Sequence, residues 1–446
     1  MPLLQLPAFL SACFHDLCAA LDRRSAPRLL LLLVSALFAK GRRTVTSWSR
    51  AASITRDFRH AYNALWAAGR HAEALAHRLL CIALKPLMRH VASDPLLFAI
   101  DDTPTARYGP KVQGAGVHHN PTPGPAGAKF VYGHLWVTLA WLVRHPAWGT
   151  LALPLRALLY VRAKDVPKLA KRSPWTFRTK LELAAERVRW LSVWLGGLGK
   201  ELRLVVDGGY AKRPFLKPVM ALGVLVFSRL RQDANLRTLP ATTRRRGSRG
   251  PMPTYGKERI DLAKRAGQKR GWRRVRCVQY GALVVKTIKS FEATWPPAGG
   301  RIRVVMVRED KGWLAYFCTD PSLTVEAILE AMADRGAIEP LFHDVKEVWG
   351  AGQQQVRNVY ASIGAFTVKL VLYSVVEAWA WARDEAEWVD RSRSPWDRED
   401  RRPSHADKRK ALQRVILQQE IHTALGQRAK RQQFQELAMR LLHLAA

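Results

Sequence analysis

The stretch Leu96-Leu-Phe-Ala-Ile-Asp-Asp102 decides the fold class. Five apolar residues followed by two acidic ones are typical of a buried strand that ends on carboxylates. A second segment, Glu201-Leu-Arg-Leu-Val-Val-Asp207, is also apolar and also ends on an acid. If these two strands are neighbours, their ends bring carboxylates from both segments together at one edge of a sheet.

The elements around these two strands predict an α/β fold with a mixed sheet. Three strands come first, then helix and strand alternate, so antiparallel pairing should give way to parallel pairing, with helices on the faces of the sheet. In chain order we expect strands over 96–101, 130–144 and 149–162, a helix over 174–198, a strand over 201–207, a helix over 214–222 and a strand over 223–228.

The remaining segments predict helical ends and a basic, β-rich insertion. Residues 229–276 hold sixteen Lys and Arg against three Asp and Glu, and strand-like stretches follow over 276–290, 301–308 and 313–319. We therefore divide the chain into a helical DNA-binding region (1–92), the first part of a core (93–228), a basic arm with a β-rich insertion (229–320), the second part of the core (321–383), and a linker with a helical tail (384–446).

The composition points to a polyanionic partner. The 446 residues include 72 Lys and Arg against 36 Asp and Glu, a net charge of +36, which favours nucleic acid or an anionic surface. The apolar run Leu29–Ala39 is too short to span a membrane, since a spanning helix needs about 20 residues. The five cysteines form no CxxC pair, so a disulfide scaffold or zinc ribbon is disfavoured. We expect an intracellular protein with no membrane partner.

Acidic and basic residues at the strand ends suit metal-assisted chemistry on phosphate. Mg²⁺ prefers oxygen ligands. The adjacent carboxylates of Asp101 and Asp102 repel each other, so placing them side by side costs free energy unless a counter-ion is present. An Asp at a strand end can instead cap the following segment, and for Asp207 alone the two interpretations stay open. Two interpretations also stay open for the basic residues. Arg42 and Arg43 can contact phosphate or lie in a solvated turn, and the run Arg244-Arg-Arg246 can be a flexible linker or an arm along a phosphate backbone.

A third acid lies in Arg335-Gly-Ala-Ile-Glu-Pro-Leu-Phe-His-Asp-Val-Lys346. Steps of four and seven place Arg335, Glu339 and Lys346 on one face of a helix. They can form an exposed salt-bridge ladder, or they can line a phosphate-bearing site with Glu339 on a metal ion. Pro340 removes a backbone donor, so the helix either begins there or kinks.

The ensemble resembles the DDE transposases of bacterial insertion sequences, in the subgroup with a Y-(2)-R-(3)-E-(6)-K signature. Arg335, Glu339 and Lys346 match its spacing, whereas Met332 stands at the position of the Tyr. Three further stretches are similar to motifs of this family, and the resemblance covers essentially the whole chain. They are Ile100-Asp-Asp-Thr-Pro-Thr105 for the first acid, Val205-Val-Asp-Gly-Gly-Tyr210 for the second, and residues 107–120.

This resemblance implies an RNase H-like core, interrupted by the β-rich insertion. It also implies cleavage of double-stranded DNA at transposon ends and strand transfer into target DNA, with two Mg²⁺ or Mn²⁺ ions. By motif position, Asp102, Asp207 and Glu339 are the expected catalytic metal ligands, and Asp101 is the alternative first acid. Arg335 and Lys346 would hold DNA phosphates. Action on two DNA ends implies a dimer or larger assembly, in the cytoplasm of a bacterium at its nucleoid.

Two other functions stay open from the sequence. One is a DNA-binding protein derived from a transposase that has lost catalysis, which the departures at Met332 and Pro340 keep open. The other is a structure-selective DNA nuclease on the same fold, which would cut branched DNA without joining ends.

Overall fold

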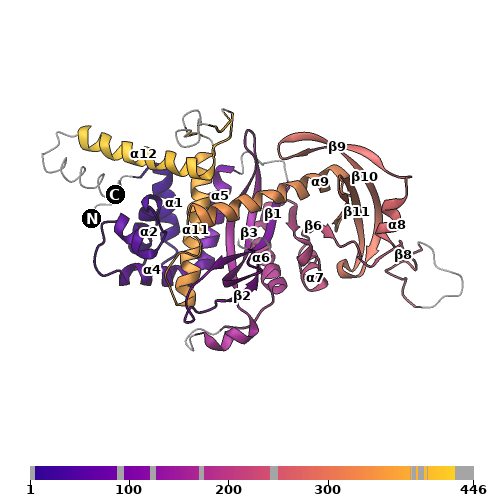
Figure 1. Cartoon of the computed structure of the whole chain (residues 1–446), viewed down its shortest axis with the longest axis horizontal. Coiled ribbons are helices and arrows are strands. Elements are labelled where there is room, and N and C mark those ends of the chain that lie inside the picture. The colour runs from indigo at the N-terminus through magenta and orange to yellow at the C-terminus, as the bar shows by residue number, and fades with distance from the viewer. Residues whose placement is uncertain are drawn as a thin grey trace.

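The structure is a computed structural model that describes residues 6–87, 95–120, 127–169, 175–241, 250–381, 383, 388–389, 396–398 and 400–426. Figure 1 shows an elongated molecule in three parts. The N-terminal helices gather with α11 and α12 at one end, a twisted sheet lies in the middle, and a β-rich region forms the other end.

The central sheet has the strand order and directions of an RNase H-like core. Strand β1 (Leu96–Ala106) pairs antiparallel with β3 (Phe130–His145), and β3 pairs antiparallel with β4 (Gly149–Tyr160). On its other side β1 is parallel to β5 (Leu202–Val206), which is parallel to β6 (Leu225–Leu230). The order β4-β3-β1-β5-β6 confirms the predicted α/β class and the expected change from antiparallel to parallel pairing.

The two faces of this sheet belong to different parts of the core. Along β1, Phe98 and Ile100 pack in one apolar cluster with side chains of α6 (Lys180–Leu195) and α7 (Arg213–Met220), whereas Ala99 belongs to the cluster around α11 (Val359–Ala380). This division follows from the alternation of side chains along a strand. Helix α6 begins at a capping box formed by Thr179 and Glu182, later than the expected start at Pro174.

The N-terminal region packs around α11. Its helices are α1 (Ala8–Cys18), α2 (Ala26–Phe38), α3 (Val45–Ala51), α4 (Arg59–Arg70) and α5 (Ala72–Leu87). Helices α4 and α5 are separated at His71, where α4 ends and α5 begins. By length and hydropathy α11 qualifies as a membrane span, but 83% of that window is buried in the fold, as in a core helix.

The β-rich insertion continues the central sheet. Strand β12 (Gly312–Cys318) pairs antiparallel with β6, and β11 (Gly300–Glu309) and β10 (Ala282–Trp295) extend the sheet beyond it. The strand expected over 276–290 is in fact a hairpin of β9 (Arg273–Gln279) and β10, because Tyr280-Gly281 makes a turn. The short elements are β2 (Gly116–His119), β7 (Leu236–Arg237), β8 (Arg259–Ile260), α8 (Leu262–Gly267), η1 (Ala163–Lys168), η2 (Gly196–Leu198), η3 (Gly208–Tyr210) and η4 (Pro296–Ala298).

The C-terminal third adds helices on the side of the sheet opposite α6 and α7. Its first part consists of α9 (Val325–Asp334), the turn η5 (Arg335–Ala337) and α10 (Ile338–Glu347). Pro340 lies in the first turn of α10, where a missing N–H breaks no helical hydrogen bond. Helix α12 (His405–Gly426) begins within the region 384–446, for which the sequence predicts a linker and a helical tail.

Candidate active site

Asp101 and Asp207 share one face of the sheet. The parallel register of β1 and β5 pairs Ile100 with Val206, so the next residue on each strand points to the same side. Asp207 also begins the turn η3, where its carboxylate accepts a hydrogen bond from the N–H of Gly209 at 3.2 Å. The adjacent strand ends therefore deliver two carboxylates to one point, as the sequence predicts.

A guanidinium group lies between these two carboxylates. Nη2 of Arg335 donates to Oδ2 of Asp101 at 2.5 Å and lies 3.9 Å from Oδ1 of Asp207. Burial raises the pKa of Asp101 to about 6, although Arg335 and the backbone N–H of Asp102 oppose this effect and Asp102 and Asp207 add to it. The point between Asp101 and Asp207 thus attracts a cation.

Asp102 points to the opposite face. Its carboxylate accepts from Nζ of Lys180 at 3.0 Å and from the hydroxyl of Tyr210 at 3.1 Å. Burial and then the carboxylate of Asp102 raise the pKa of Tyr210 well above its ordinary value, so the phenol stays protonated and donates. Both oxygens of Asp102 are therefore held under α6 and η3, on the other side of the sheet from Arg335.

Glu339 follows Arg335 by four residues, across the boundary between η5 and α10. Arg335 lies in η5, while Glu339 is exposed in the first turn of α10, where the helix dipole favours an acidic residue. The turn is anchored through Asp334, which is 7% exposed. Asp334 accepts from Nε and Nη2 of Arg144 at 2.9 and 2.8 Å and from the hydroxyl of Thr150. The ends of β3 and β4 therefore fix the turn that carries Arg335 and Glu339.

The carboxylate oxygens of the aspartate pair are the kind of ligand that a hard divalent cation prefers. Asp101 and Asp207 present carboxylate oxygens on one face, with a cationic group already between them. Within the described residues, no three His, Cys, Asp or Glu side chains lie close enough to hold one metal ion. Glu339 would therefore have to move toward the pair to become a third ligand.

The remaining signature positions have different surroundings. Met332 is partly buried against the apolar cluster formed by α9, β9 and β11, so this position contributes packing. Lys346 is half-buried, and desolvation lowers its pKa.

The adjacent Arg42 and Arg43 have different surroundings. Arg43 donates to the carbonyls of Gly41 and Val348, whereas Arg42 lines an open pocket. Arg244, Arg245 and Arg246 lie outside the described residues.

The structure adds residues at the site that sequence reasoning missed. Arg229 lies near the end of β6 and Arg231 follows the strand, and both line, with Asp207, a shallow cavity of about 490 Å³. These cations lie at the end of β6, the strand next to β5, so a search for charged residues at strand ends, which identified Asp207, would have found them as well.

Tyr280 is a further exposed residue near the site. It is 80% exposed and has a positive φ of 53°. Its ring lies against Gly336 of the η5 turn, which also carries Arg335: a Cβ added to Gly336 would lie 3.2 Å from the ring carbon Cε1 of Tyr280.

The comparisons with known proteins agree with this core. Residues 13–282 match the family model described as DDE superfamily endonuclease. The matched region contains Asp101, Asp102 and Asp207 and ends before Glu339. A search of curated proteins found no match. The matched region covers more than half of the 446 residues, and the chain therefore belongs to the DDE superfamily of endonucleases, which act on DNA.

Proposed function

We propose that this protein is a DNA transposase that cleaves DNA at the ends of a mobile element and joins them to target DNA. The observation that carries the proposal is the pairing of Asp101 and Asp207 at the ends of parallel strands β1 and β5, with Arg335 between them and Glu339 in the next turn. Membership of the DDE superfamily supports it.

We further propose Asp101, Asp207 and Glu339 as the acidic triad. The motif resemblance points to Asp102 as the first acid, but Asp101 shares a face with Asp207 and Arg335, whereas Asp102 is bonded to Lys180 and Tyr210. Two Mg²⁺ or Mn²⁺ ions held by the triad would supply Lewis-acid stabilisation of the phosphate that is attacked.

The chain's own residues would position the DNA around this triad. Arg335 already binds a carboxylate oxygen of Asp101, and a DNA phosphate can replace this partner when cations neutralise the acids. Arg229 and Arg231 border Asp207, and the exposed Tyr280 stands over the η5 turn. These groups would hold the strand with the scissile phosphate against Asp101 and Asp207.

The proposal is tested with linear DNA that carries the flanking ends of the gene's own element. Wild type and the variants Asp101→Asn, Asp102→Asn, Asp207→Asn and Glu339→Gln are incubated with Mg²⁺ or Mn²⁺. We expect nicking at the element boundary, followed by joining to a target plasmid, and loss of both in the triad variants. Cutting of branched DNA without joining would identify a structure-selective nuclease. Binding without any cleavage by wild type would identify a DNA-binding derivative.

A further inference from the structure

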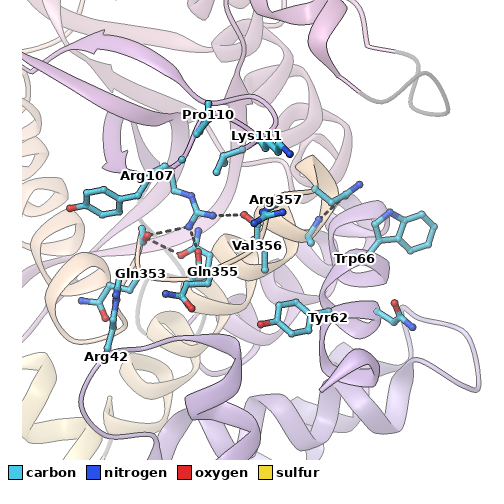
Figure 2. A pocket seen from close by; sticks show the side chains of 18 residues that line it. Arg42, Tyr62, Trp66, Arg107, Pro110, Lys111, Gln353, Gln355, Val356 and Arg357 are labelled. Atoms are coloured by element: carbon cyan, nitrogen blue, oxygen red, sulfur yellow. Dashed lines mark hydrogen bonds between the residues drawn. The ribbon is translucent and has the colours of Figure 1, made fainter. Parts of the chain in front are cut away.

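An open pocket lies at the junction of the N-terminal helices with the core. It has a volume of about 960 Å³, at the upper end of the roughly 300–1,000 Å³ of small-ligand sites. Four segments line it: the loop after α2, helix α4, the loop after β1 and the loop before α11. Figure 2 shows Tyr62 and Trp66 of α4 across the pocket from Pro110 and Lys111. We call it the junction pocket.

The charge of the junction pocket favours an anion. Arg42, Arg107, Lys111 and Arg357 are among its 18 lining residues, and the lining contains no Asp or Glu. Arg42, Lys111 and Arg357 are exposed, and their side chains have no hydrogen bond or ion pair to another residue that the structure describes. Such a concentration of unpaired cations raises the local concentration of phosphate groups.

The wall of the pocket is rigid before any ligand arrives. Arg107 is 5% exposed and donates to the carbonyls of Gly352, Gln354 and Val356, as the dashed lines in Figure 2 trace. Gln113 binds the same loop, since its N–H donates to the carbonyl of Arg357 at 2.9 Å. The loop before α11 is therefore fixed to the loop after β1, and little conformational entropy remains to be lost on binding.

Two buried donors in this wall lack an acceptor. Nε of Arg107 and Nε2 of Gln354 have no hydrogen-bond partner within the described part of the chain. The orientation of Gln354 is fixed, because its Oε1 accepts from Nζ of Lys369 at 2.5 Å and from the N–H of Gly352 at 3.0 Å. Both nitrogens are shielded from solvent, so they add to the electropositive character of the wall without contacting a ligand directly.

The aromatic residues identify the ligand more closely. Trp66 is 46% and Tyr108 is 77% exposed, so both rings present aromatic surface to a ligand in the pocket. The indole of Trp66 is oriented by Tyr360, at 6.4 Å between ring centroids in an edge geometry, and by the guanidinium of Arg70. Exposed rings beside cations are the pattern that stacks unpaired bases while binding their phosphates. Paired bases of a duplex are not available to such rings.

We propose that the junction pocket binds one unpaired nucleotide of a DNA strand, with its base on Trp66 and Tyr108 and its phosphate on Arg42, Lys111 and Arg357. The inference rests on the proposed cleavage of DNA ends, and it adds a second point, besides the acidic triad, at which the protein contacts the DNA strand. Arg107 comes six residues after Asp101, directly after strand β1 ends at Ala106, so the Cα atoms of these two residues lie at most about 20 Å apart. A strand that reaches both sites would be unpaired a few nucleotides from the scissile phosphate, at roughly 3.4 Å per nucleotide.

The test compares two DNA probes of equal length and arbitrary sequence, one blunt and one with a short single-stranded extension that carries 2-aminopurine. Affinity is measured by anisotropy without divalent metal, so the result does not depend on cleavage. We expect wild type to prefer the extended probe and to quench its 2-aminopurine. Trp66→Ala should lower affinity for the extended probe by about tenfold, the effect of losing one stacking contact, and leave the blunt probe unchanged. Trp66→Phe should restore most of the loss.

Trp194→Ala is the matched control, because Trp194 is 45% exposed, stacks on His77 and does not line the pocket. It should bind both probes as wild type does. Equal affinity of wild type for the two probes, or an equal loss in Trp66→Ala and Trp194→Ala, overturns the pocket proposal. A wild type that never cleaves element ends but keeps the Trp66-dependent preference refutes the transposase proposal and leaves the pocket standing.

Discussion

The guanidinium of Arg335 lies 2.5 Å from a carboxylate oxygen of Asp101 and 3.9 Å from one of Asp207. The two acids are adjacent because β1 and β5 are parallel neighbours, and Arg335 reaches them from a turn that the β3–β4 hairpin anchors through Asp334. The two acids thus hold a cationic side chain that we propose as a contact for a DNA phosphate.

The first prediction distinguishes the two candidates for the first acid. Asp101→Asn should lower the rate of element-end cleavage by on the order of a thousandfold, as expected when a group that acts only in the transition state is lost. Asp102→Asn should keep the rate within about tenfold, because it removes only contacts to Lys180 and Tyr210. Single-turnover cleavage measures both rates. The opposite ranking would assign the first acid to Asp102, as the motif resemblance does.

The second prediction concerns competition between Arg335 and a metal ion. Arg335→Gln should tighten Mn²⁺ binding to the DNA-free protein by about tenfold, equivalent to ~1.4 kcal/mol, because the guanidinium no longer occupies the acids. The same variant should cleave more slowly, since a phosphate contact is lost. Electron paramagnetic resonance of free Mn²⁺ measures the affinity. Arg301→Gln is the control, as Arg301 pairs with Glu292 on the distant strands β10 and β11. Unchanged Mn²⁺ affinity in Arg335→Gln contradicts the competition.

The third prediction tests the anchor of the η5 turn. Asp334→Asn weakens its bonds to Arg144 and Thr150 and should loosen the turn that carries Arg335 and Glu339. We expect a cleavage rate lower by about a hundredfold, typical of misplacing a catalytic group by about 1 Å, with DNA affinity unchanged. Single-turnover rates and anisotropy separate the two quantities. A parallel loss of DNA affinity would show that Asp334 supports binding and not positioning.

The sequence predicts the central strands well but does not by itself decide between two adjacent acids. The strands ending at Asp101 and Asp207 are recognisable, because a short apolar run bounded by polar residues is typical of a buried strand. The choice between Asp101 and Asp102 depends on which face α10 covers. Adjacent residues of a strand point to opposite sides, so this choice needs the tertiary structure.

The features that the sequence did not reveal depend on contacts between distant segments. The junction pocket combines Arg42, Trp66, Lys111 and Arg357, which no local pattern connects. Tyr280 lies within a stretch that the sequence predicts as one continuous strand, because a Tyr at a positive φ is an uncommon turn residue. The start of α12 has the composition of a linker, but its residues Lys408 and His405 pair with the buried Glu377 of α11.

The fourth prediction concerns the close crossing of α4 and α11. A Cβ on Gly364 would lie 1.8 Å from the carbonyl oxygen of Leu65, so Gly364→Ala must push the two helices apart. We expect a loss of about 1–3 kcal/mol in stability, typical of overpacking, seen as a lower urea midpoint. Because α4 carries Trp66, the preference for unpaired DNA should also fall. Gly267→Ala is the control, since a Cβ there meets nothing within 4 Å. Full stability of Gly364→Ala would contradict this crossing.

The last prediction concerns the buried ion pair that holds α12 on α11. Glu377 accepts from Nζ of Lys408 and from Nδ1 of His405, each at 2.6 Å, and all three side chains are at most 3% exposed. Nε2 of His405 accepts from the indole of Trp349 at 2.8 Å, so the imidazole proton is on Nδ1. Burial raises the pKa of Glu377, but Lys408 and His405 outweigh burial and lower the pKa from 4.5 to about 2.

A carboxyl group whose pKa is lowered by folding contributes its full stability above the unfolded value. Stability should therefore be lost as the pH falls from 4.5 toward 2. Glu377→Gln should lower the free energy of unfolding at neutral pH by about 3–5 kcal/mol, because Lys408 is left buried without a counter-charge. The double variant with Lys408→Met should recover much of this loss. Urea midpoints across this pH range measure both effects, and Asp400→Asn, in an exposed pair with Arg398, should change neither. A Glu377→Gln midpoint equal to wild type would show that the pair does not stabilise α12.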